Sequence, residues 1–362
     1  METKTQVVYT NWDPCNDIEM LGLQRMSFKD WTKNPSGVFL YAIDYRYNFD
    51  SAGLNFAKLY DNVHILLDDT LEGFSYRTFK KVYELVKDYN LENRVTYATG
   101  HLDAEKEYTL WLRDQKKIFD VYPLNSWFWR HRDWAVDCGN DVSVDKDIWY
   151  CCLQNRPRQH RSATTIYLHY LDLLKHGLVS ANIFNLYNVF NPENFNKSVL
   201  LKKQIPKVDK ILPLCLDVYG DIDKCYPNDL NPDIYGRTLI NLVSETFYTE
   251  NDNNRVSEMF ITEKTYKSFT CYQMPVIIGP KGVVKRLREY GFDMFDDIID
   301  HSYDDLDDAE RLFGAVDVLR QIIENKNLTK LNAATKKRRI DNKKLYLNGL
   351  NIDKKVTDYL CT

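Results

Sequence analysis

A polar stretch that leads into an apolar one stands out in the C-terminal half of this sequence. The polar stretch covers Thr262 to Lys267, and the apolar residues Pro275 to Ile278 follow after a short spacer and end in Gly279-Pro280. The first pattern predicts the start of a short helix, and the second predicts a buried strand that ends in a turn. A helix that feeds a buried strand is typical of an α/β domain.

The residues at this helix start favour an anion-binding site. The first turn of a helix presents unpaired backbone N–H groups and the positive end of the helix dipole, which suit a phosphate. Lys264 and Lys267 add positive charge there, where the dipole disfavours cations unless an anion is nearby. Glu263 can accept hydrogen bonds from sugar hydroxyls. These residues outline a nucleotide-diphosphate site; an ordinary capped helix with solvated lysines is the alternative.

The region from about Arg237 to Asp304 resembles the donor-binding part of two groups of glycosyltransferases. Thr262-Glu263-Lys264 before a helix, with the Pro275 to Pro280 strand after it, is similar to the motif of fucosyltransferase-like enzymes. The Leu287 to Phe295 stretch, L-R-x-x-G-F-x-x-F, makes the chain more similar to a group of phage-encoded glycosyltransferases.

The resemblance implies a fold of the GT-B class and a UDP- or GDP-linked sugar as donor. We expect Lys264, together with arginines of the same domain, to hold the phosphates and Glu263 to hold ribose hydroxyls, with Thr262 and Lys267 in the same donor site. The resemblance also implies an acidic residue at a strand end before this motif, where Glu245 stands. Glu245 is expected to hold ribose or sugar hydroxyls; a solvated strand-end glutamate is the alternative.

A second cationic segment follows an apolar strand at Trp149 to Leu153. It contains Arg156, Arg158 and Arg161, and the phage-type relatives show a similar N-R-x-R-x-H-R element. Strand-to-helix turns lie at the carboxyl edge of a parallel sheet, where open α/β folds bind ligands. Arg158 and Arg161 are therefore expected on the donor diphosphate, with bidentate contacts. A basic surface turn is the alternative, and His160 is expected to be structural.

The sequence does not favour a metal site. Asp221-Ile222-Asp223 has the spacing of a metal-binding pair, but it lies in a loop rich in Asp, Lys, Asn and Pro. The eight cysteines include no C-x-x-C pair, so buried free thiols are the simplest account. We expect metal-independent chemistry in which lysines and arginines neutralise the leaving diphosphate.

An inverting transfer needs a base that takes the proton of the acceptor hydroxyl. In a GT-B enzyme it comes from the first domain, and the first candidates are Asp69 and Glu72, after the predicted Val63 to Leu67 strand. Asp68 follows the same strand, Asp44 and His101 follow two other predicted strands, and each candidate could equally be a cap or turn residue. The aromatic and basic segment Trp127 to Trp134 either stacks on a base or sugar or wedges between the domains.

Alternating strand and helix patterns predict the architecture of the first half. Short apolar runs predict strands, and the apolar spacing of Tyr76 to Tyr89 predicts a helix. A further helix is expected between Asp44 and Tyr60. The predicted strands are Gln6 to Tyr9, Val38 to Ile43, Val63 to Leu67, Arg94 to Ala98 and Ile118 to Tyr122.

The pattern restarts near residue 145. A strand is predicted at Asp147 to Leu153 and a helix from Arg161 to His176, stopped by Gly177. Four shorter strands are predicted at Ile183 to Tyr187, Ile211 to Leu216, Leu239 to Ser244 and Val276 to Ile278, and two helices at Ala309 to Asn325 and Leu331 to Leu347.

The predicted fold is therefore α/β, with two Rossmann-like domains whose mainly parallel sheets face a cleft. Residues 1–144 form the acceptor domain, 145–325 the donor domain, and 326–362 a helical segment that can pack back on the first domain.

Charge and hydropathy bear on location and partners. No apolar run approaches the roughly 20 residues that span a bilayer, and no secretory signal is visible, so a cytoplasmic protein is expected, in the host cytoplasm if it is phage-encoded. The net charge is −4, yet Lys336 to Arg339 with Lys343-Lys344 form a basic tract. That tract is either a solvated helix face or a phosphate-binding patch.

The sequence thus predicts a glycosyltransferase that moves a sugar from a nucleotide diphosphate to an acceptor hydroxyl. Double-stranded DNA with 5-hydroxymethylated pyrimidines is the first acceptor to consider. A surface glycan or lipopolysaccharide is the alternative acceptor, and a non-catalytic nucleic-acid-binding protein with a nucleotide fold is the alternative outside the enzymes. The sequence contains no P-loop, nucleophile-elbow or H-E-x-x-H motif.

Overall fold

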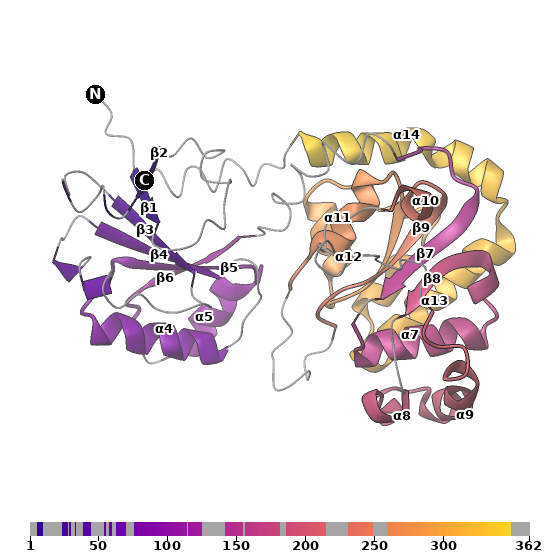
Figure 1. The fold of residues 1–362 in the computed structure, drawn as a ribbon, viewed down its shortest axis with the longest axis horizontal. Helices are drawn as coiled ribbons and strands as arrows, with labels where there is room; N and C mark the ends of the chain where they lie inside the picture. The colour runs from indigo at the N-terminus through magenta and orange to yellow at the C-terminus, as the bar shows by residue number, and fades with distance from the viewer. Residues whose placement is uncertain are drawn as a thin grey trace. The chain divides into compact units, whose positions relative to one another are not determined.

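The chain divides into two compact units, each drawn in Figure 1. Residues 1–130, 253–260 and 351–362 form the first unit, and residues 131–252 and 261–350 form the second. The computed structural model describes residues 6–9, 24–27, 29, 33, 39–44, 54–55, 58–59, 63–69, 76–113, 115–124, 142–154, 156–181, 186–214, 231–248 and 259–348.

The first unit is built on a sheet of six parallel strands in the order β2-β1-β3-β4-β5-β6. The strands are β1 (Gln6–Tyr9), β2 (Gln24–Ser27), β3 (Phe39–Asp44), β4 (Val63–Asp69), β5 (Val95–Thr99) and β6 (Asp120–Pro123). Helix α4 (Tyr76–Asp88) connects β4 to β5, and α5 (Ala104–Leu112) connects β5 to β6. Both crossovers move the chain in the same direction along the sheet, so a common right-handed sense puts both helices on one face, as Figure 1 shows.

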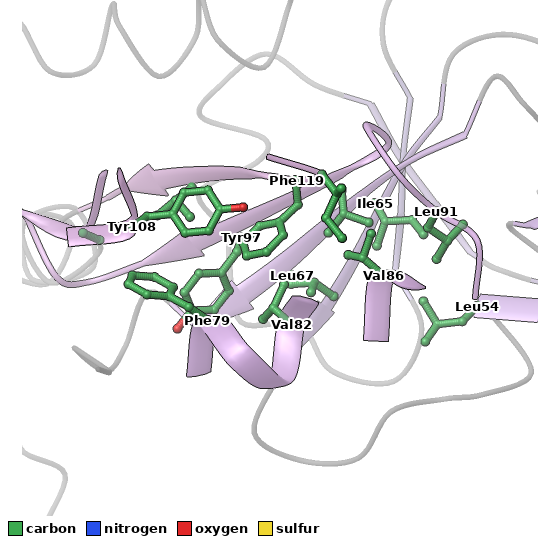
Figure 2. Packing of buried hydrophobic residues seen from close by; sticks show 14 residues of the cluster. Leu54, Ile65, Leu67, Phe79, Val82, Val86, Leu91, Tyr97, Tyr108 and Phe119 are labelled. Atoms are coloured by element: carbon green, nitrogen blue, oxygen red, sulfur yellow. The ribbon is translucent and has the colours of Figure 1, made fainter. Parts of the chain in front are cut away.

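Aromatic side chains hold α4 and α5 on this sheet. Phe79 of α4, Tyr97 of β5 and Tyr108 of α5 are buried, and the Phe79 ring lies 6.3 Å from that of Tyr97 and 5.3 Å from that of Tyr108. Figure 2 shows these rings together with the aliphatic side chains of β4 and α4. Full burial of an aromatic side chain of this kind contributes about 1.5–3 kcal/mol. The buried apolar side chains of α4, Phe79, Val82 and Val86, are among those whose spacing predicts the helix.

The second unit is built on four parallel strands in the order β10-β9-β7-β8. The strands are β7 (Ile148–Gln154), β8 (Gly177–Ala181), β9 (Thr238–Ser244) and β10 (Met274–Ile278). β9 and β10 are buried along their whole length, as expected for strands covered on both faces. The helices are α7 (Gln159–Tyr170), α8 (Leu186–Val189), α9 (Ser198–Val208), α10 (Pro232–Tyr235), α11 (Glu263–Thr270), α12 (Val283–Glu289), α13 (Asp308–Asn325) and α14 (Leu328–Leu347).

Helices cover both faces of this second sheet. The chain moves from β7 to β8 through α7 and, in the opposite direction, from β9 to β10 through α11, so right-handed crossovers put α7 and α11 on opposite faces. Tyr167 of α7 packs edge-on against Phe313 of α13, with ring centroids 4.9 Å apart. Tyr266 of α11 stacks on Tyr346 of α14 at 5.5 Å. The prediction of two α/β units with parallel sheets is confirmed.

Two predictions near α7 and β8 differ from the structure. Of the strand predicted at Ile183 to Tyr187, residues 183–185 lie outside the described residues and Leu186 begins α8, whereas β8 covers Gly177–Ala181. The predicted helix through His176 ends at Tyr170 and is followed by a 3₁₀ turn at Leu174–His176. Gly177 was interpreted as a helix stop, but it is required because a Cβ there would lie 2.4 Å from the ring of Tyr150.

The strand predicted at Ile211 to Leu216 is, among the described residues, only a bridge. Leu214 pairs with Ala181 in an antiparallel manner, and no ladder extends from it in the described part of the chain. Several elements had no sequence prediction, among them β2, α5 and α9. Helix α9 contains Pro206 and three exposed lysines, and its buried apolar residues are Leu201, Ile205 and Val208.

The basic tract of α14 is largely used inside the second unit. Arg339 is fully buried and donates hydrogen bonds to the carbonyls of Val144 (2.9 Å) and Tyr272 (2.7 Å). Lys343 is also buried. Lys336 pairs with Asp145, and Arg338 pairs with Asp293 and Asp297. Within the tract, Lys337 and Lys344 are the two exposed residues, so neither interpretation of it as a solvated face or as a phosphate patch holds.

Candidate functional site

The carboxyl ends of β7 and β9 lie side by side at the point where the strand order reverses. β7 pairs with β9, the chain leaves β7 toward β8 on one side, and it leaves β9 toward β10 on the other. Open α/β sheets bind ligands in the crevice at such a switch point. Both cationic segments singled out in the sequence come to this edge, because one follows β7 directly and the other opens α11 after β9.

The N-terminus of α11 is capped by Thr262. This residue has extended backbone angles (φ −106°, ψ 179°), and its hydroxyl oxygen accepts a hydrogen bond from the N–H of Lys264 at 3.4 Å. An N-cap threonine fixes where the helix begins and how its first turn is directed. The predicted helix start is therefore confirmed at the Thr262-Glu263 junction.

Glu245, the first residue after β9, fastens this helix start to the sheet. Its side chain is fully buried and accepts four hydrogen bonds. Oε1 accepts from the N–H of Thr262 (3.1 Å) and the hydroxyl of Thr265 (2.6 Å); Oε2 accepts from the N–H of Thr246 (3.1 Å) and the hydroxyl of Thr262 (2.6 Å). A carboxylate offers about four acceptor positions. None is left for a sugar hydroxyl, so the predicted role of Glu245 changes from ligand binding to positioning.

Gly279 makes room for this arrangement. A Cβ at Gly279 would lie 3.3 Å from both Cβ and Cγ of Glu245, which is tighter than ordinary van der Waals contact. The glycine in the predicted strand-end Gly279-Pro280 pair is therefore explained by the close approach of Glu245.

The first turn of α11 carries an ion pair. Nζ of Lys264 lies 2.7 Å from Oε1 of Glu263, and it also donates to the hydroxyls of Thr262 (3.2 Å) and Thr246 (3.3 Å). The Glu263 side chain is 5% exposed, and that of Lys264 is 30% exposed. Burial acts to raise the pKa of Glu263, but Lys264 and Lys267 outweigh it, so the pKa lies below its ordinary value. Glu263 is thus ionised, and Lys264 keeps partial access to solvent.

Arg161 ties the β7–α7 turn to the end of β9. One terminal nitrogen donates to the carbonyl of Arg156 (3.1 Å), and the other donates to the carbonyls of Ser244 and Glu245 (3.2 Å each). Arg161 is 4% exposed, and its Nε is buried with no hydrogen-bond partner among the described residues. A buried guanidinium N–H without an acceptor is costly, so the site holds a donor that an anionic oxygen would satisfy.

The charged side chains of the site act on one another, and cations outnumber carboxylates among them. Burial, followed by the nearby charge of Arg158, lowers the pKa of Arg161 to about 10, while Glu245 and Glu263 act to raise it. The four cations predicted to bind the donor face two carboxylates, so these six side chains carry a net formal charge of +2. That balance suits a diphosphate. The cations are Arg158, Arg161, Lys264 and Lys267, and the carboxylates are Glu245 and Glu263.

His160 is structural, as predicted. Its Nε2 lies 3.0 Å from the carbonyl oxygen of Glu245, and its ring stacks on Tyr248 with centroids 5.1 Å apart. Burial, followed by the charge of Arg161, lowers the pKa of His160 well below its ordinary value. The ring is therefore neutral, and it adds no charge to the site.

Arg311 of α13 supports the site and was missed in the sequence. Its buried guanidinium donates to the carbonyls of Gly279 (3.1 Å), Leu306 (2.8 Å) and Tyr248 (2.7 Å) and pairs with Asp308. It also lies over the Tyr248 ring at 4.9 Å. The residue thereby joins the chain after β9 to the chain after β10. Nothing in the sequence separates it from a solvated helix arginine.

The catalytic candidates of the first unit lie at the carboxyl edge of its sheet. Asp69 ends β4, is buried, and accepts a hydrogen bond from the hydroxyl of Tyr97 at 2.6 Å. His101 follows β5 and is buried beside Glu107. Three predictions lie outside the described residues: Glu72, the Trp127 to Trp134 segment and the Asp221-Ile222-Asp223 pair.

Among the described residues, no three or more His, Cys, Asp or Glu side chains gather as metal ligands. No helix in the described part of the chain is both long and apolar enough to cross a bilayer.

Several solved structures have a fold similar to this one. Three of them are a glycosyltransferase, a trehalose-phosphate synthase and a β-glucosyltransferase. A glycosyltransferase from Rickettsia africae ESF-5 is 10% identical, with a TM-score of 0.46 over 99% of this chain and 98% of that chain. The UDP-forming α,α-trehalose-phosphate synthase from Burkholderia vietnamiensis is 10% identical, with a TM-score of 0.43 over 94% and 80%. The DNA-modifying enzyme β-glucosyltransferase, solved with and without uridine diphosphoglucose, is 9% identical, with a TM-score of 0.35 over 95% and 99%.

No protein-family model and no curated protein matches the chain. At these identities and TM-scores, the structural likeness assigns neither an activity nor individual residues. The function therefore has to come from the residues of the site itself.

Proposed function

We propose that this protein is a glycosyltransferase that takes a sugar from a nucleoside-diphosphate sugar bound at the β7–β9 edge. One observation carries the proposal: four cationic side chains and a capped helix N-terminus meet at the switch point of a parallel sheet. A buried Arg161 N–H lacks an acceptor there, so the site is preorganised for an anion rather than neutralised internally. A diphosphate leaving group develops negative charge in the transition state, and fixed cations stabilise it.

Each residue has a distinct part in this proposal. Lys264, at 30% side-chain exposure, and Arg158, at the N-cap of α7, contact the phosphates directly. Arg161 donates its unpartnered Nε–H to a phosphate oxygen. Lys267 adds charge from the next turn of α11, and Thr262 directs the helix start.

Two residues of the donor motif act less directly. Glu263 accepts ribose hydroxyls with the oxygen that Lys264 does not occupy. Glu245 holds the whole helix start in place through its four hydrogen bonds.

Donor binding is tested by thermal shift and calorimetry with UDP, GDP and their sugars. A ligand at 100 times its Kd stabilises a fold by about 2.7 kcal/mol. Lys264→Ala and Arg158→Ala should each weaken nucleotide-diphosphate affinity by roughly 10- to 100-fold, the range of one to two charge-assisted hydrogen bonds. Lys337→Ala is the matched control, since Lys337 is exposed on α14; it should bind like the wild type. If no nucleoside diphosphate binds the wild type, the proposal fails.

For the acceptor, we propose the hydroxyl of a 5-hydroxymethylated pyrimidine in DNA as the first to test. The internal contacts of the α14 tract remove one sequence argument for DNA, so the acceptor needs its own experiment. The protein is incubated with hydroxymethylated DNA and each donor that binds. The DNA is then digested, and the masses of its nucleosides are measured by mass spectrometry. A hexose-sized mass gain supports the proposal. Transfer to an oligosaccharide with none to DNA would favour the surface-glycan alternative, and donor binding without any transfer would favour the non-catalytic one.

A further inference from the structure

Helix α9 carries a basic surface that the proposed donor site does not use. Lys203 and Lys207 of α9 are exposed, and so is Lys210, just after the end of the helix. The first two are four residues apart, so they lie on one side of the helix, and Lys210 follows about one turn later. These three residues, named here the α9 lysine surface, lie wholly within the second unit.

The charge of this surface is not neutralised by the described part of the protein. No carboxylate among the described residues forms an ion pair with any of the three lysines, although their neighbour Lys202 pairs with Glu193. Asp209 is the acidic residue nearest to them in the sequence, and its Oδ1 accepts a hydrogen bond from the N–H of Leu186 at 3.0 Å. Like charges one helical turn apart repel each other, so an external anion would stabilise them.

The apolar face of α9 is already occupied. Leu201, Ile205 and Val208 are buried, and the helix packs on α7, as Figure 1 shows. A helix that binds a membrane surface needs its apolar face free to enter the lipid. Val199 is the one large apolar side chain of α9 that is exposed, which is little for insertion. The exposed side of α9 therefore offers charge rather than apolar area, and it suits a polyanion.

The segment that leads into α9 contacts the start of α7. The N–H of Asn191 donates to Oε1 of Gln159 at 2.8 Å, and the side chain of Asn196 donates to Oε1 of Glu310, in the first turn of α13, at 2.7 Å. Gln159 directly follows Arg158 of the candidate donor site. A polyanion bound on α9 would therefore be held on the same unit as the donor, which raises its local concentration there.

We propose that the α9 lysine surface binds the phosphate backbone of double-stranded DNA without reading its base sequence. The inference rests on the proposed function, since it supplies the contact with a DNA acceptor that the α14 tract does not. Lys203 to Lys210 spans about 10 Å at 1.5 Å per helical residue, and one DNA strand presents a phosphate about every 3.4 Å of helix axis. Three lysines can thus each reach a phosphate of one strand. Such contacts position a duplex and carry no sequence information.

The experiment measures binding of the full chain to an unmodified DNA duplex, without a donor, by fluorescence anisotropy at several salt concentrations. The α9 triple variant, Lys203→Ala/Lys207→Ala/Lys210→Ala, removes the three charges. Three neutralised phosphates contribute about −2.7 to the slope of log K against log[salt], so they account for roughly 40-fold in affinity between about 50 and 200 mM salt. The α9 triple variant should lose this part of the salt dependence, and each single variant about a third of it.

A matched control removes the same charge from another helix of the second unit. Lys330→Ala/Lys337→Ala/Lys344→Ala changes three exposed lysines of α14, and it should bind DNA like the wild type. Both triple variants change exposed side chains, so their denaturation midpoints and their affinities for nucleoside diphosphates should match those of the wild type. With hydroxymethylated duplex as acceptor, the α9 triple variant should raise KM and leave kcat unchanged, because its lysines hold the DNA and do not touch the reacting atoms.

Equal DNA affinities of the two triple variants, or a wild type that binds no DNA at about 50 mM salt, would overturn the inference. Binding to vesicles of anionic phospholipid that the α9 triple variant loses, with DNA binding unchanged, would also overturn it, because the surface would then serve a membrane. The proposed function is tested separately by donor binding. A wild type that binds DNA through α9 but no nucleoside diphosphate defeats the proposed function and leaves this surface in place, and a wild type that binds a donor but no DNA does the reverse.

Discussion

Thr262 donates twice to Glu245, once from its backbone N–H to Oε1 at 3.1 Å and once from its hydroxyl to Oε2 at 2.6 Å. The two residues are 17 positions apart in the sequence, and the pair joins the end of β9 to the start of α11. The location of the candidate phosphate-binding turn therefore depends on a carboxylate that itself has no free acceptor for a ligand.

Replacing Glu245 with Gln should both destabilise the fold and weaken donor binding. One oxygen becomes an NH₂ group that faces two hydrogen-bond donors, so at least two charge-assisted bonds are lost, at about 1.5–3 kcal/mol each before relaxation. We expect a net loss of about 2–4 kcal/mol in urea unfolding, and a larger loss of donor affinity than that of Thr246→Ala. Glu289→Gln, on the exposed side of α12, is the control and should change stability by less than about 0.5 kcal/mol. An unchanged donor affinity in folded Glu245→Gln would contradict the positioning role.

Arg311→Lys should be strongly destabilising although it keeps the charge. The guanidinium of Arg311 reaches the carbonyls of Gly279, Leu306 and Tyr248 from one planar group. An ammonium cannot make these bonds with the same geometry, so one or two buried carbonyls lose their donor, at about 1–3 kcal/mol each. Arg237→Lys is the matched control, because Arg237 is 55% exposed and pairs with Asp147 on the surface. Equal denaturation midpoints for the two variants would contradict this account.

The sequence revealed those parts of the site that are contiguous in the chain. Thr262, Lys264 and Lys267 fall within six residues, so their shared helix start and their charge could be predicted together. Arg158 and Arg161 were found for the same reason, since a strand and a helix flank them.

The parts that depend on distant partners could not be predicted. Glu245 looked like a ligand-binding residue because nothing in the sequence shows that Thr262 and Thr265 fill its acceptor sites. The basic tract of α14 looked exposed because the carbonyls that bind Arg339 belong to Val144 and Tyr272, far away in the chain.

The errors in predicting strands also arise from contacts with residues that are distant in the sequence. Gly177 ends one predicted helix on local grounds, yet the structure needs a glycine there because the ring of Tyr150 on the neighbouring strand leaves no room for a Cβ. Apolar residues such as Ile211 pattern like a strand but are 40% exposed in the structure. Apolar periodicity predicts a helix or strand well when that element buries one of its own faces. It does not predict structure that depends on one contact with a residue far away in the sequence.

The stability of the folded protein should depend on pH through Asp304. Its Oδ2 caps α12 by accepting from the N–H groups of Val284 (3.0 Å) and Lys285 (3.3 Å). Burial raises its pKa to about 6. The folded state therefore holds its proton at pH values where the unfolded state has lost it, and stability from this group falls as pH rises from about 4 to 6.

Asp304→Asn removes this titration and keeps an acceptor for the α12 N–H groups. The stability of the variant relative to the wild type should therefore improve by about 1–3 kcal/mol between pH 4.5 and pH 8, from 1.36 kcal/mol per pKa unit. Urea unfolding at the two pH values measures it. Asp300→Asn is the control: bonds to Ser302 lower the pKa of Asp300, so Asp300 is ionised in both the folded and the unfolded states over this pH range, and the relative stability of Asp300→Asn should stay nearly constant. A pH-independent difference for Asp304→Asn would refute the assignment.

Lys146 is buried at the opposite edge of the second sheet, just before β7. Its buried ammonium donates to the carbonyls of Ser143 (2.6 Å), Tyr235 (2.8 Å) and Cys271 (2.8 Å). Lys146→Met leaves these carbonyls without a donor, and we expect a loss of about 2–4 kcal/mol at pH 7. Lys207→Met on the exposed face of α9 should be nearly neutral.

The pH dependence of Lys146→Met separates burial of the charge from loss of packing. Burial lowers the pKa of Lys146 to about 8, so below pH 8 both the folded and the unfolded states carry the proton. Between pH 8 and about 10.5 the unfolded state holds more protons, and the stability that the wild type gains from this group rises with pH. The gap between the wild type and Lys146→Met should therefore widen between pH 7 and pH 9.5, by about 1–2 kcal/mol. A constant gap would mean that the ammonium is not desolvated, and the carbonyl cluster would then be held by packing alone.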